Sequence, residues 1–257
     1  MTGFLVKKFF YDAWDNFFFI SAVNFGFYLF LALSFFLLPM FQLAGVILFF
    51  VLIYFLFVYL CTASSVLKEV SDYRRPGPAD FFINIKNAFV PALVFFAAAV
   101  IVFMLIRFTI PVYLEMDSLP GLGAAFFSCW ICLFIIASLQ FYPAVYYRLG
   151  KRPIKSIKKC IIIFFDNTGF SLITLFISIL LSVLVLPFPG CTLLFLDEAI
   201  RLRLLKYDWQ DAQTAAQNNE NYQPRSKKTK IPWNEILAEE KENTGTRTLK
   251  SFIFPWK

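Results

Sequence analysis

Long runs of uncharged apolar residues alternate along the chain with short segments rich in lysine and arginine. Each run is close to the roughly 20 residues that an α-helix needs to cross a hydrocarbon core about 30 Å thick. Several such runs in one chain predict a bundle of membrane-spanning helices. We expect six spans, at about residues 17–38, 44–63, 88–110, 125–147, 169–187 and 191–205.

The distribution of basic residues predicts how these spans are threaded, because lysine and arginine are retained on the cytoplasmic side of a membrane. Lys7 and Lys8 precede the first span, and further basic residues follow the second and fourth spans. The connections at 39–43 and 111–123 contain none. We therefore expect both ends of the chain in the cytoplasm, with the first span retained as an anchor and no removable targeting segment.

The last apolar segment is the least regular, since Asp197, Glu198, Arg201 and Arg203 interrupt residues 191–205. A charge near the bilayer centre costs on the order of a few kcal/mol, which disfavours a span exposed to lipid. A cytoplasmic C-terminus nevertheless requires an even number of crossings. The sequence thus favours a short sixth span partly buried by its neighbours, and the alternative is five spans with a re-entrant or interfacial segment.

A recurring spacing divides the spans into three hairpins. Lys7-Lys8 stands before Asp15-Asn16, and Lys158-Lys159 stands at the same spacing before Asp166-Asn167. Lys86 introduces the third span without an Asp-Asn pair. The segments that lead into these hairpins place apolar side chains on one helical face and lysines opposite, as in a helix lying at the level of the lipid headgroups. We call these three predicted interfacial helices elbows. Either an internal repeat or the ordinary basic approach to a cytoplasmic span explains this pattern.

The chain changes character after the predicted all-α transmembrane domain at 1–206. Residues 207–230 are rich in Gln, Asn and Lys and predict a disordered cytoplasmic linker. Residues 231–257 bring back large apolar side chains, which the membrane interface, the protein's own cytoplasmic loops or a partner could bury. The candidate docking residues of this tail are Trp233, Ile236, Leu237, Phe252, Phe254 and Trp256.

Composition removes several functional classes. Apolar residues make up 59% of the 257 residues and histidine is absent, which excludes His-ligated zinc and His-activated nucleophiles. Cys129 and Cys132 have a metal-site spacing, but no second pair completes four ligands. The net charge of +7 is explained by inside loops and tail rather than by a nucleic-acid-binding domain. We expect no catalytic, cofactor or metal site, and partners limited to the bilayer and a membrane or cytoplasmic protein.

Polar residues within the spans are the remaining candidates for function, because each is costly there unless it is paired or hydrated. Asn24, Gln140, Asp166 and Asn167 are the candidates for a polar path. Their convergence on one cavity would indicate a permease, whereas hydrogen bonds between helices or caps at helix starts would be structural roles.

One group of motifs resembles a known family. Gln140-Phe141-Tyr142-Pro143 is followed by the basic segment 154–159, by residues 165–169 and by Pro189-Gly190. This order resembles the second half of the YesL-like family of small bacterial membrane proteins, although Thr168 stands where that family has proline. The resemblance implies a bacterial plasma membrane, no known catalytic residues and an accessory role, since such proteins are frequently associated with carbohydrate-uptake loci.

These observations leave three functional hypotheses. The preferred one is a non-catalytic accessory or assembly protein that acts through its cytoplasmic tail and basic elbows. The alternative is a small permease or transporter component with a polar path through the bundle. A membrane enzyme would need carboxylates at the interface, for which Asp12, Asp15 and Asp166 form the one inside cluster.

Overall fold

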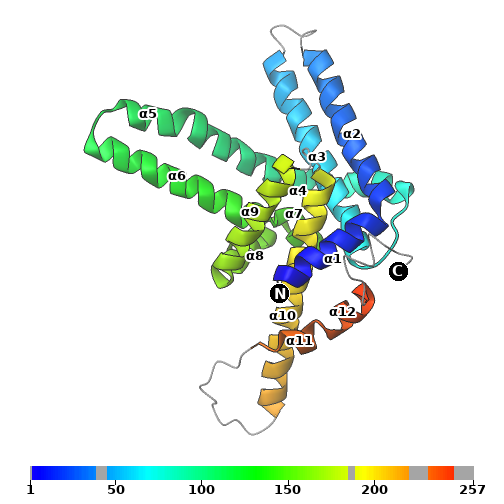
Figure 1. Ribbon diagram of the computed structural model, residues 1–257. Helices are drawn as coiled ribbons and strands as arrows, with labels where there is room; N and C mark the ends of the chain where they lie inside the picture. The colour runs from blue at the N-terminus through cyan, green and yellow to red at the C-terminus, as the bar shows by residue number, and fades with distance from the viewer. Residues whose placement is uncertain (1, 39–44, 185–188, 220–230, 246–257) are drawn as a thin grey trace.

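The computed structural model is all-helical over the residues that it describes, 2–38, 45–184, 189–219 and 231–245. Two long hairpins, α2–α3 and α4–α6, project in different directions from a base that contains both the first and the last helices (Figure 1). The elements are α1 (Thr2–Asp15), α2 (Phe17–Leu37), α3 (Gly45–Ser71), α4 (Pro78–Met104), the π-helical turn η2 (Leu105–Thr109), α5 (Ile110–Glu115), α6 (Leu119–Leu139), α7 (Tyr142–Arg148), α8 (Pro153–Asp166), α9 (Thr168–Leu184), α10 (Pro189–Asn219), α11 (Trp233–Ile236) and α12 (Ala238–Thr244).

Four stretches of the described chain are long and apolar enough to cross a membrane: Phe17–Leu37, Ile47–Ser71, Pro78–Glu115 and Leu119–Arg148. They coincide with the first four predicted spans, as in a membrane protein. A fifth stretch counts only if α8 and α9, which are bent by 104° at their junction, are taken as one span. The helix α10 is not among these stretches, so the described residues contain four or five candidate spans and the predicted sixth is not confirmed.

Two of the three predicted elbow helices are separate helices. The helix α1 ends just before Asn16, and α8 ends just before Asn167. Both asparagines leave the helical conformation, with φ −113° and ψ 24° at Asn16 and φ −139° and ψ 46° at Asn167. Asparagine favours such a break because its side chain competes for backbone hydrogen bonds; the Nδ2 of Asn16 donates to the carbonyl oxygen of Asp12 at 2.9 Å. The repeated Asp-Asn pair therefore marks a repeated change of helix direction.

The second predicted elbow is wrong, because α4 runs unbroken from Pro78 to Met104. Its amphipathic beginning is the first part of the spanning helix. Residues 81–89 lack the Asp-Asn pair that breaks the other two, and Pro91 lies inside α4 without ending it. A single proline removes one hydrogen bond but leaves the rest of a well-packed helix in place.

The α9–α10 hairpin is shallower than its neighbours. The backbone N–H of Gly190, at the start of α10, donates to Oδ1 of Asn24 at 2.9 Å. Asn24 lies in the first half of α2, and in Figure 1 the α2–α3 hairpin continues well beyond the upper ends of α9 and α10. A Cβ atom at position 190 would lie 2.9 Å from Oδ1 of Asn24, so a larger residue there would displace this side chain from its contact. The hairpin therefore reaches only part of the way along α2.

From this contact α10 runs on unbroken to Asn219, and the whole helix has 31 residues. The first part of the predicted linker, residues 207–219, is accordingly helical. The rest of the linker, residues 220–230, lies outside the described residues.

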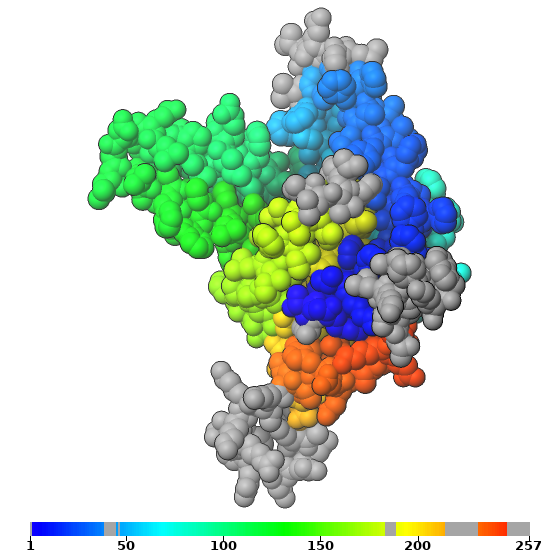
Figure 2. Space-filling model, viewed as in Figure 1, coloured from blue at the N-terminus to red at the C-terminus, as the bar shows by residue number. Residues whose placement is uncertain are grey.

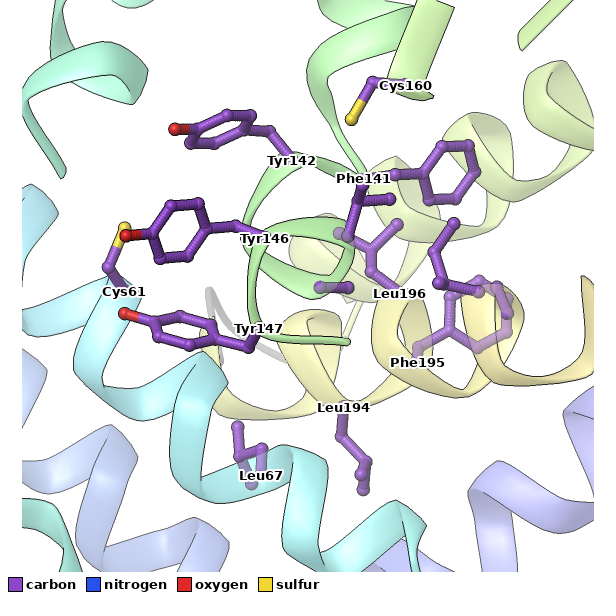
Figure 3. Close-up of a cluster of buried hydrophobic side chains, with 14 of the residues drawn as sticks. Cys61, Leu67, Phe141, Tyr142, Tyr146, Tyr147, Cys160, Leu194, Phe195 and Leu196 are labelled. Atoms are coloured by element: carbon purple, nitrogen blue, oxygen red, sulfur yellow. The ribbon is translucent and has the colours of Figure 1, made fainter. Parts of the chain in front are cut away.

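The short helix α7 occupies the centre of the base. Figure 3 shows Tyr142, Tyr146 and Tyr147 pointing from α7 toward Cys61 of α3. The helix α10 adds the buried Phe195, whose ring meets that of Phe9 of α1 edge-on at 5.4 Å. The apolar core thus joins α1, α3, α7 and α10, which are far apart in the sequence.

The tail helices α11 and α12 pack against the same base. Leu237, between them, is 2% exposed, and the guanidinium of Arg203 on α10 lies 5.7 Å from the centre of the Trp233 ring. Three surfaces could bury the tail, and α11 and α12 contact one of them, the protein's own base. The predicted docking residue Ile236 is half-buried. Phe252, Phe254 and Trp256 lie outside the described residues.

Candidate functional site

A cluster of buried charged side chains lies where α1, α3, α7, α10 and α12 meet. Lys8, Asp197 and Glu198 are each 0% exposed, which is rare for charged residues unless they are paired. We call this cluster the charged core. Its members are Lys8, Asp12, Asp72, Arg148, Asp197, Glu198, Arg201 and Glu240.

Arg148, the last residue of α7, connects the end of α3 to α10. Its Nε donates to Oδ1 of Asp197 at 3.0 Å, and its Nη1 donates to Oδ1 of Asp72 at 3.0 Å. The hydroxyl of Ser71 also donates to Asp197. A planar guanidinium can hold two carboxylates in fixed directions, which an ammonium group cannot do. Arg148 therefore fixes the relative positions of three helices.

Arg201, one helical turn after Asp197 on α10, attaches the tail to the same cluster. It pairs with Asp72, and its Nη1 donates to the carbonyl oxygen of Ser71 at 2.7 Å. Its Nε donates to Oε1 of Glu240 on α12 at 2.8 Å. The last described helix is thus paired with α10 and, through Arg201, linked to the end of α3.

Tyr73 joins the first and last helices of the chain. It has a φ of 59°, an uncommon left-handed conformation for a non-glycine residue, just after α3 ends. Its ring centre lies 4.1 Å from Nζ of Lys8, and its hydroxyl donates to Oε2 of Glu240 at 2.7 Å. Burial, reinforced by the charge of Glu240, raises the pKa of Tyr73, so this hydroxyl keeps the proton that it donates.

The acidic end of the charged core contains a carboxyl group without a donor. Lys8 pairs with Asp12 one turn away on α1 and donates to the carbonyl oxygen of Ser71 at 3.2 Å. Burial raises the pKa of Asp12, while the charge of Lys8 acts in the opposite direction. Neither carboxyl oxygen of Glu198 has a hydrogen-bond partner among the described residues, and Asp12 is its acidic neighbour on α1. Burial raises the pKa of Glu198 as well, so the two carboxyl groups can share a proton, the protonated one donating to the other.

The geometry of the charged core is that of a lock between helices. The guanidinium groups of Arg148 and Arg201 are occupied by carboxylates on other segments. Buried ion pairs of this kind add little net stability over an apolar core, but breaking one leaves a buried charge uncompensated. Among the described residues no group of three or more cysteine or acidic side chains is arranged to hold a metal, and Cys129 is exposed whereas Cys132 is buried.

The predicted polar-path residues Asp166 and Asn167 belong to a separate cluster at the α8–α9 break. Oδ2 of Asp166 accepts hydrogen bonds from Nζ of Lys206 at 2.7 Å and from the hydroxyl of Tyr207 at 2.8 Å. Nδ2 of Asn167 donates to the same hydroxyl at 3.0 Å. These contacts tie the break to the lower part of α10. Asn24 is likewise occupied, by its contact with Gly190.

Gln140 lines a third feature, a cavity of about 590 Å³ between α2, α3, α4, α6, α9 and α10. In Figure 2 the surface is hollowed between the α2–α3 and α4–α6 hairpins. The lining is almost wholly apolar, and Gln140 is the one member of the predicted polar path within it. The structure therefore places the four predicted residues at three different sites.

The charged core is not among the sites predicted from the sequence. Two signals were present, the four-residue spacings Lys8–Asp12 and Asp197–Arg201, which place opposite charges on one helical face. In residues 191–205 the sequence indicates only that the charges make insertion into a membrane unfavourable. The carboxylates weighed for an enzyme lie apart, with Asp12 in the charged core and Asp166 at the α8–α9 break.

Comparisons of the chain with protein-family models, with curated proteins and with solved structures gave no match. The resemblance to the YesL-like family therefore stays a prediction.

Proposed function

We propose that the chain is a non-catalytic accessory or assembly protein of the bacterial plasma membrane, and that a partner protein contacts its docked tail. The observation that carries this proposal is the attachment of α12 to the base through Glu240. The exposed surface of the tail includes Glu235, Glu239 and Glu242. A helix fixed by buried contacts presents such acidic groups in a constant orientation, as recognition of a basic surface requires.

The contacts of the polar-path residues support an accessory role over a permease. A permease for a polar solute needs polar groups along one path through the bundle. Here Asn24 is bonded to Gly190, Asp166 is paired with Lys206, and the cavity beside Gln140 is apolar. The resemblance to the YesL-like family points in the same direction, since it implies an accessory role.

The proposed membrane placement has four crossings and a re-entrant α9–α10 hairpin, with both ends of the chain in the cytoplasm. Its support is the contact between Gly190 and Asn24, which keeps the hairpin shallow. Four crossings satisfy the even number that the basic loops require. The charges of α10, including Asp197 and Arg201, then stay at the level of the base and need not cross the membrane.

Thiol labelling tests this placement. Pro189→Cys, in a chain whose native cysteines are replaced by alanine, should not react with a membrane-impermeant maleimide added outside the cell. Asp117→Cys should react from outside, and Arg152→Cys should react only after the membrane is permeabilised. Labelling of position 189 from outside would show that the hairpin crosses and would support six spans.

Photo-crosslinking from the tail tests the partner. A photoreactive amino acid at position 239, in cells that express the full chain, should give a discrete adduct with one protein. Glu235→Lys/Glu242→Lys should abolish that adduct, whereas the same charge reversal at the exposed Asp117 should not. Charge reversal on the exposed side is preferable to deleting the tail, because deletion would also remove Glu240 from Arg201. An adduct unchanged by the double reversal, or no adduct, would contradict the proposal.

A further inference from the structure

The exposed face of α8 combines apolar and basic side chains. Ile154, Ile162 and Phe165 are 81%, 52% and 65% exposed. Lys158 lies in the same row between Ile154 and Ile162, because residues four positions apart are neighbours on the surface of a helix. Lys155 is exposed beside this row. The opposite side of α8 is buried in the protein, so this mixed face is the one that can contact another molecule.

The basic groups on and just before this face are not neutralised by the described part of the chain. Four basic side chains make no ion pair or hydrogen bond to any described residue: Lys151, Arg152, Lys155 and Lys158. The one acidic residue of α8, Asp166, is paired with a lysine of α10. A cluster of exposed cations without carboxylates attracts an anionic partner.

The helix α1, the elbow with the same Lys-Lys and Asp-Asn spacing, lacks such a face. Lys8 is 0% exposed and pairs with Asp12 inside the charged core. Lys7 remains exposed, but the exposed Asp15 on the same helix offsets its charge. The same motif therefore supplies the charged core in α1 and leaves free lysines in α8.

The position of α8 identifies the kind of anion. The spanning stretch Leu119–Arg148 ends shortly before α8 begins, and the apolar helix α9 follows after a bend of 104°. In Figure 1 α8 lies at the outer edge of the base, beneath the end of α6. With 14 residues α8 is about 21 Å long, which is too short to cross a hydrocarbon core about 30 Å thick. The helix is therefore held at the membrane boundary, where lipid headgroups lie.

We infer that the exposed face of α8 binds the headgroups of anionic phospholipids in the cytoplasmic leaflet, of which phosphatidylglycerol is the representative. Lys155 and Lys158 contact the phosphate groups, while the isoleucine and phenylalanine side chains of the row lie among the acyl chains. A lipid fits this face better than an acidic protein, because the lysines alternate with large apolar side chains next to segments that enter the membrane. The inference rests on the proposed membrane placement and is independent of the proposed partner of the tail.

Photolabelling in vesicles tests the inference. The full chain is reconstituted in phosphatidylcholine vesicles with a small fraction of phosphatidylglycerol that carries a diazirine in its acyl chain, and labelled peptic peptides are quantified by mass spectrometry. This probe should label the α8 peptide more strongly than a phosphatidylcholine probe with the same acyl chain. Lys155→Gln/Lys158→Gln should lower that preference about fivefold or more, since one lysine near an anionic surface contributes roughly that factor.

Two double variants are the matched controls for charge. Lys155→Arg/Lys158→Arg keeps both positive charges on α8 and should keep the preference for the anionic probe. Lys7→Gln/Lys86→Gln removes the same number of charges from exposed positions on α1 and α4, and should leave the preference at α8 unchanged. All these side chains are exposed, so the variants should elute and unfold as the unaltered chain does.

A third variant separates the apolar part of the face from its charges. Ile154→Ser/Phe165→Ser should lower labelling of the α8 peptide by both probes, because the helix then sits less deeply among the acyl chains, and should keep the ratio between them.

Three results would overturn the inference: no labelling of the α8 peptide, equal labelling by the two probes, or a preference that Lys155→Gln/Lys158→Gln leaves unchanged. The last two would favour an acidic protein segment as the partner of α8. A failure of the proposed placement is distinguishable, because it appears as thiol labelling of Arg152→Cys from outside the cell, whereas the lipid preference is measured in vesicles.

Discussion

The base and the two projecting hairpins place their polar and apolar side chains in opposite ways. In the base, Lys8 and Asp197 have no exposed surface. On the hairpins, Phe18 and Leu119 are each 87% exposed. A soluble protein would have the reverse arrangement at both places. Exposed apolar side chains make the hairpins compatible with contact with lipid, whereas the base is held together by ion pairs and hydrogen bonds between its helices.

The largest effect expected from this difference follows from removing the central guanidinium of the base. Arg148→Met leaves Asp197 buried without its cation and Asp72 with one fewer. We expect a loss of about 3–5 kcal/mol in the free energy of unfolding, as for other buried pairs that lose one partner. Unfolding in detergent, followed by circular dichroism, measures it. Arg152→Met, at an exposed position, should change little, and equal stability of the two variants would disprove the lock.

A smaller effect is expected where the base holds the tail. Glu240→Gln removes the charge that pairs with Arg201 but keeps a side chain of the same shape. The expected loss is about 1–3 kcal/mol for the docked state. Limited proteolysis should then cleave between α10 and α12 faster than in the unaltered chain. Glu239→Gln, on the exposed side, is the control, and the idea of a clamped tail fails if both variants are cleaved at the same rate.

The charged core should also give the stability of the protein a characteristic dependence on pH. Burial raises the pKa of Asp12 above its ordinary value of 3.8, so the folded state keeps this proton at pH values where the unfolded chain has lost it. The stabilising contribution of Asp12 is therefore complete below that ordinary value and is lost as the pH rises through the raised pKa. Lys8→Met/Asp12→Leu removes the titrating group together with its cation. Thermal unfolding of this variant should decline less over the same pH range, and parallel profiles would contradict the assignment.

The smallest effect is expected on the hairpins. Phe18→Ala should change the free energy of unfolding by less than about 0.5 kcal/mol, because the side chain is exposed and lipid replaces its contacts. Phe195→Ala in the core of the base should cost about 3–5 kcal/mol. The pair is measured in the same detergent. Similar losses in both would mean that Phe18 packs against protein and that the hairpin is not lipid-facing there.

Local patterns in the sequence predicted the hairpins well, since the length of an apolar run and the Asp-Asn breaks are properties of neighbouring residues. The breaks at Asn16 and Asn167 illustrate this. The separate elbow helix predicted before the third span is wrong, because an amphipathic pattern alone does not end a helix. Lys86 lies in helix α4, which runs from Pro78 to Met104 and continues even past Pro91.

The charged core could not be predicted in the same way, because its pairs join distant segments. Arg148 and Asp197 are 49 residues apart, and Ser71 and Asp197 are 126 residues apart. A single sequence contains the charges but not their pairing. The partner of Gln140 on another helix could not be predicted either, because its Nε2 donates to the carbonyl oxygen of Ser171, which is 31 residues away in the sequence.

The position of Tyr73 between Lys8 and Glu240 has a consequence for biosynthesis. Lys8 is translated before Asp197 and Glu240. The ribosome therefore releases the first helix long before the partners that complete its surroundings exist. A chain truncated before α10 lacks Asp197 and Glu240, so Arg148 loses a carboxylate partner and the hydroxyl of Tyr73 loses its acceptor. The charged core is therefore complete only when the chain has been made and folded as far as α12, its last described helix.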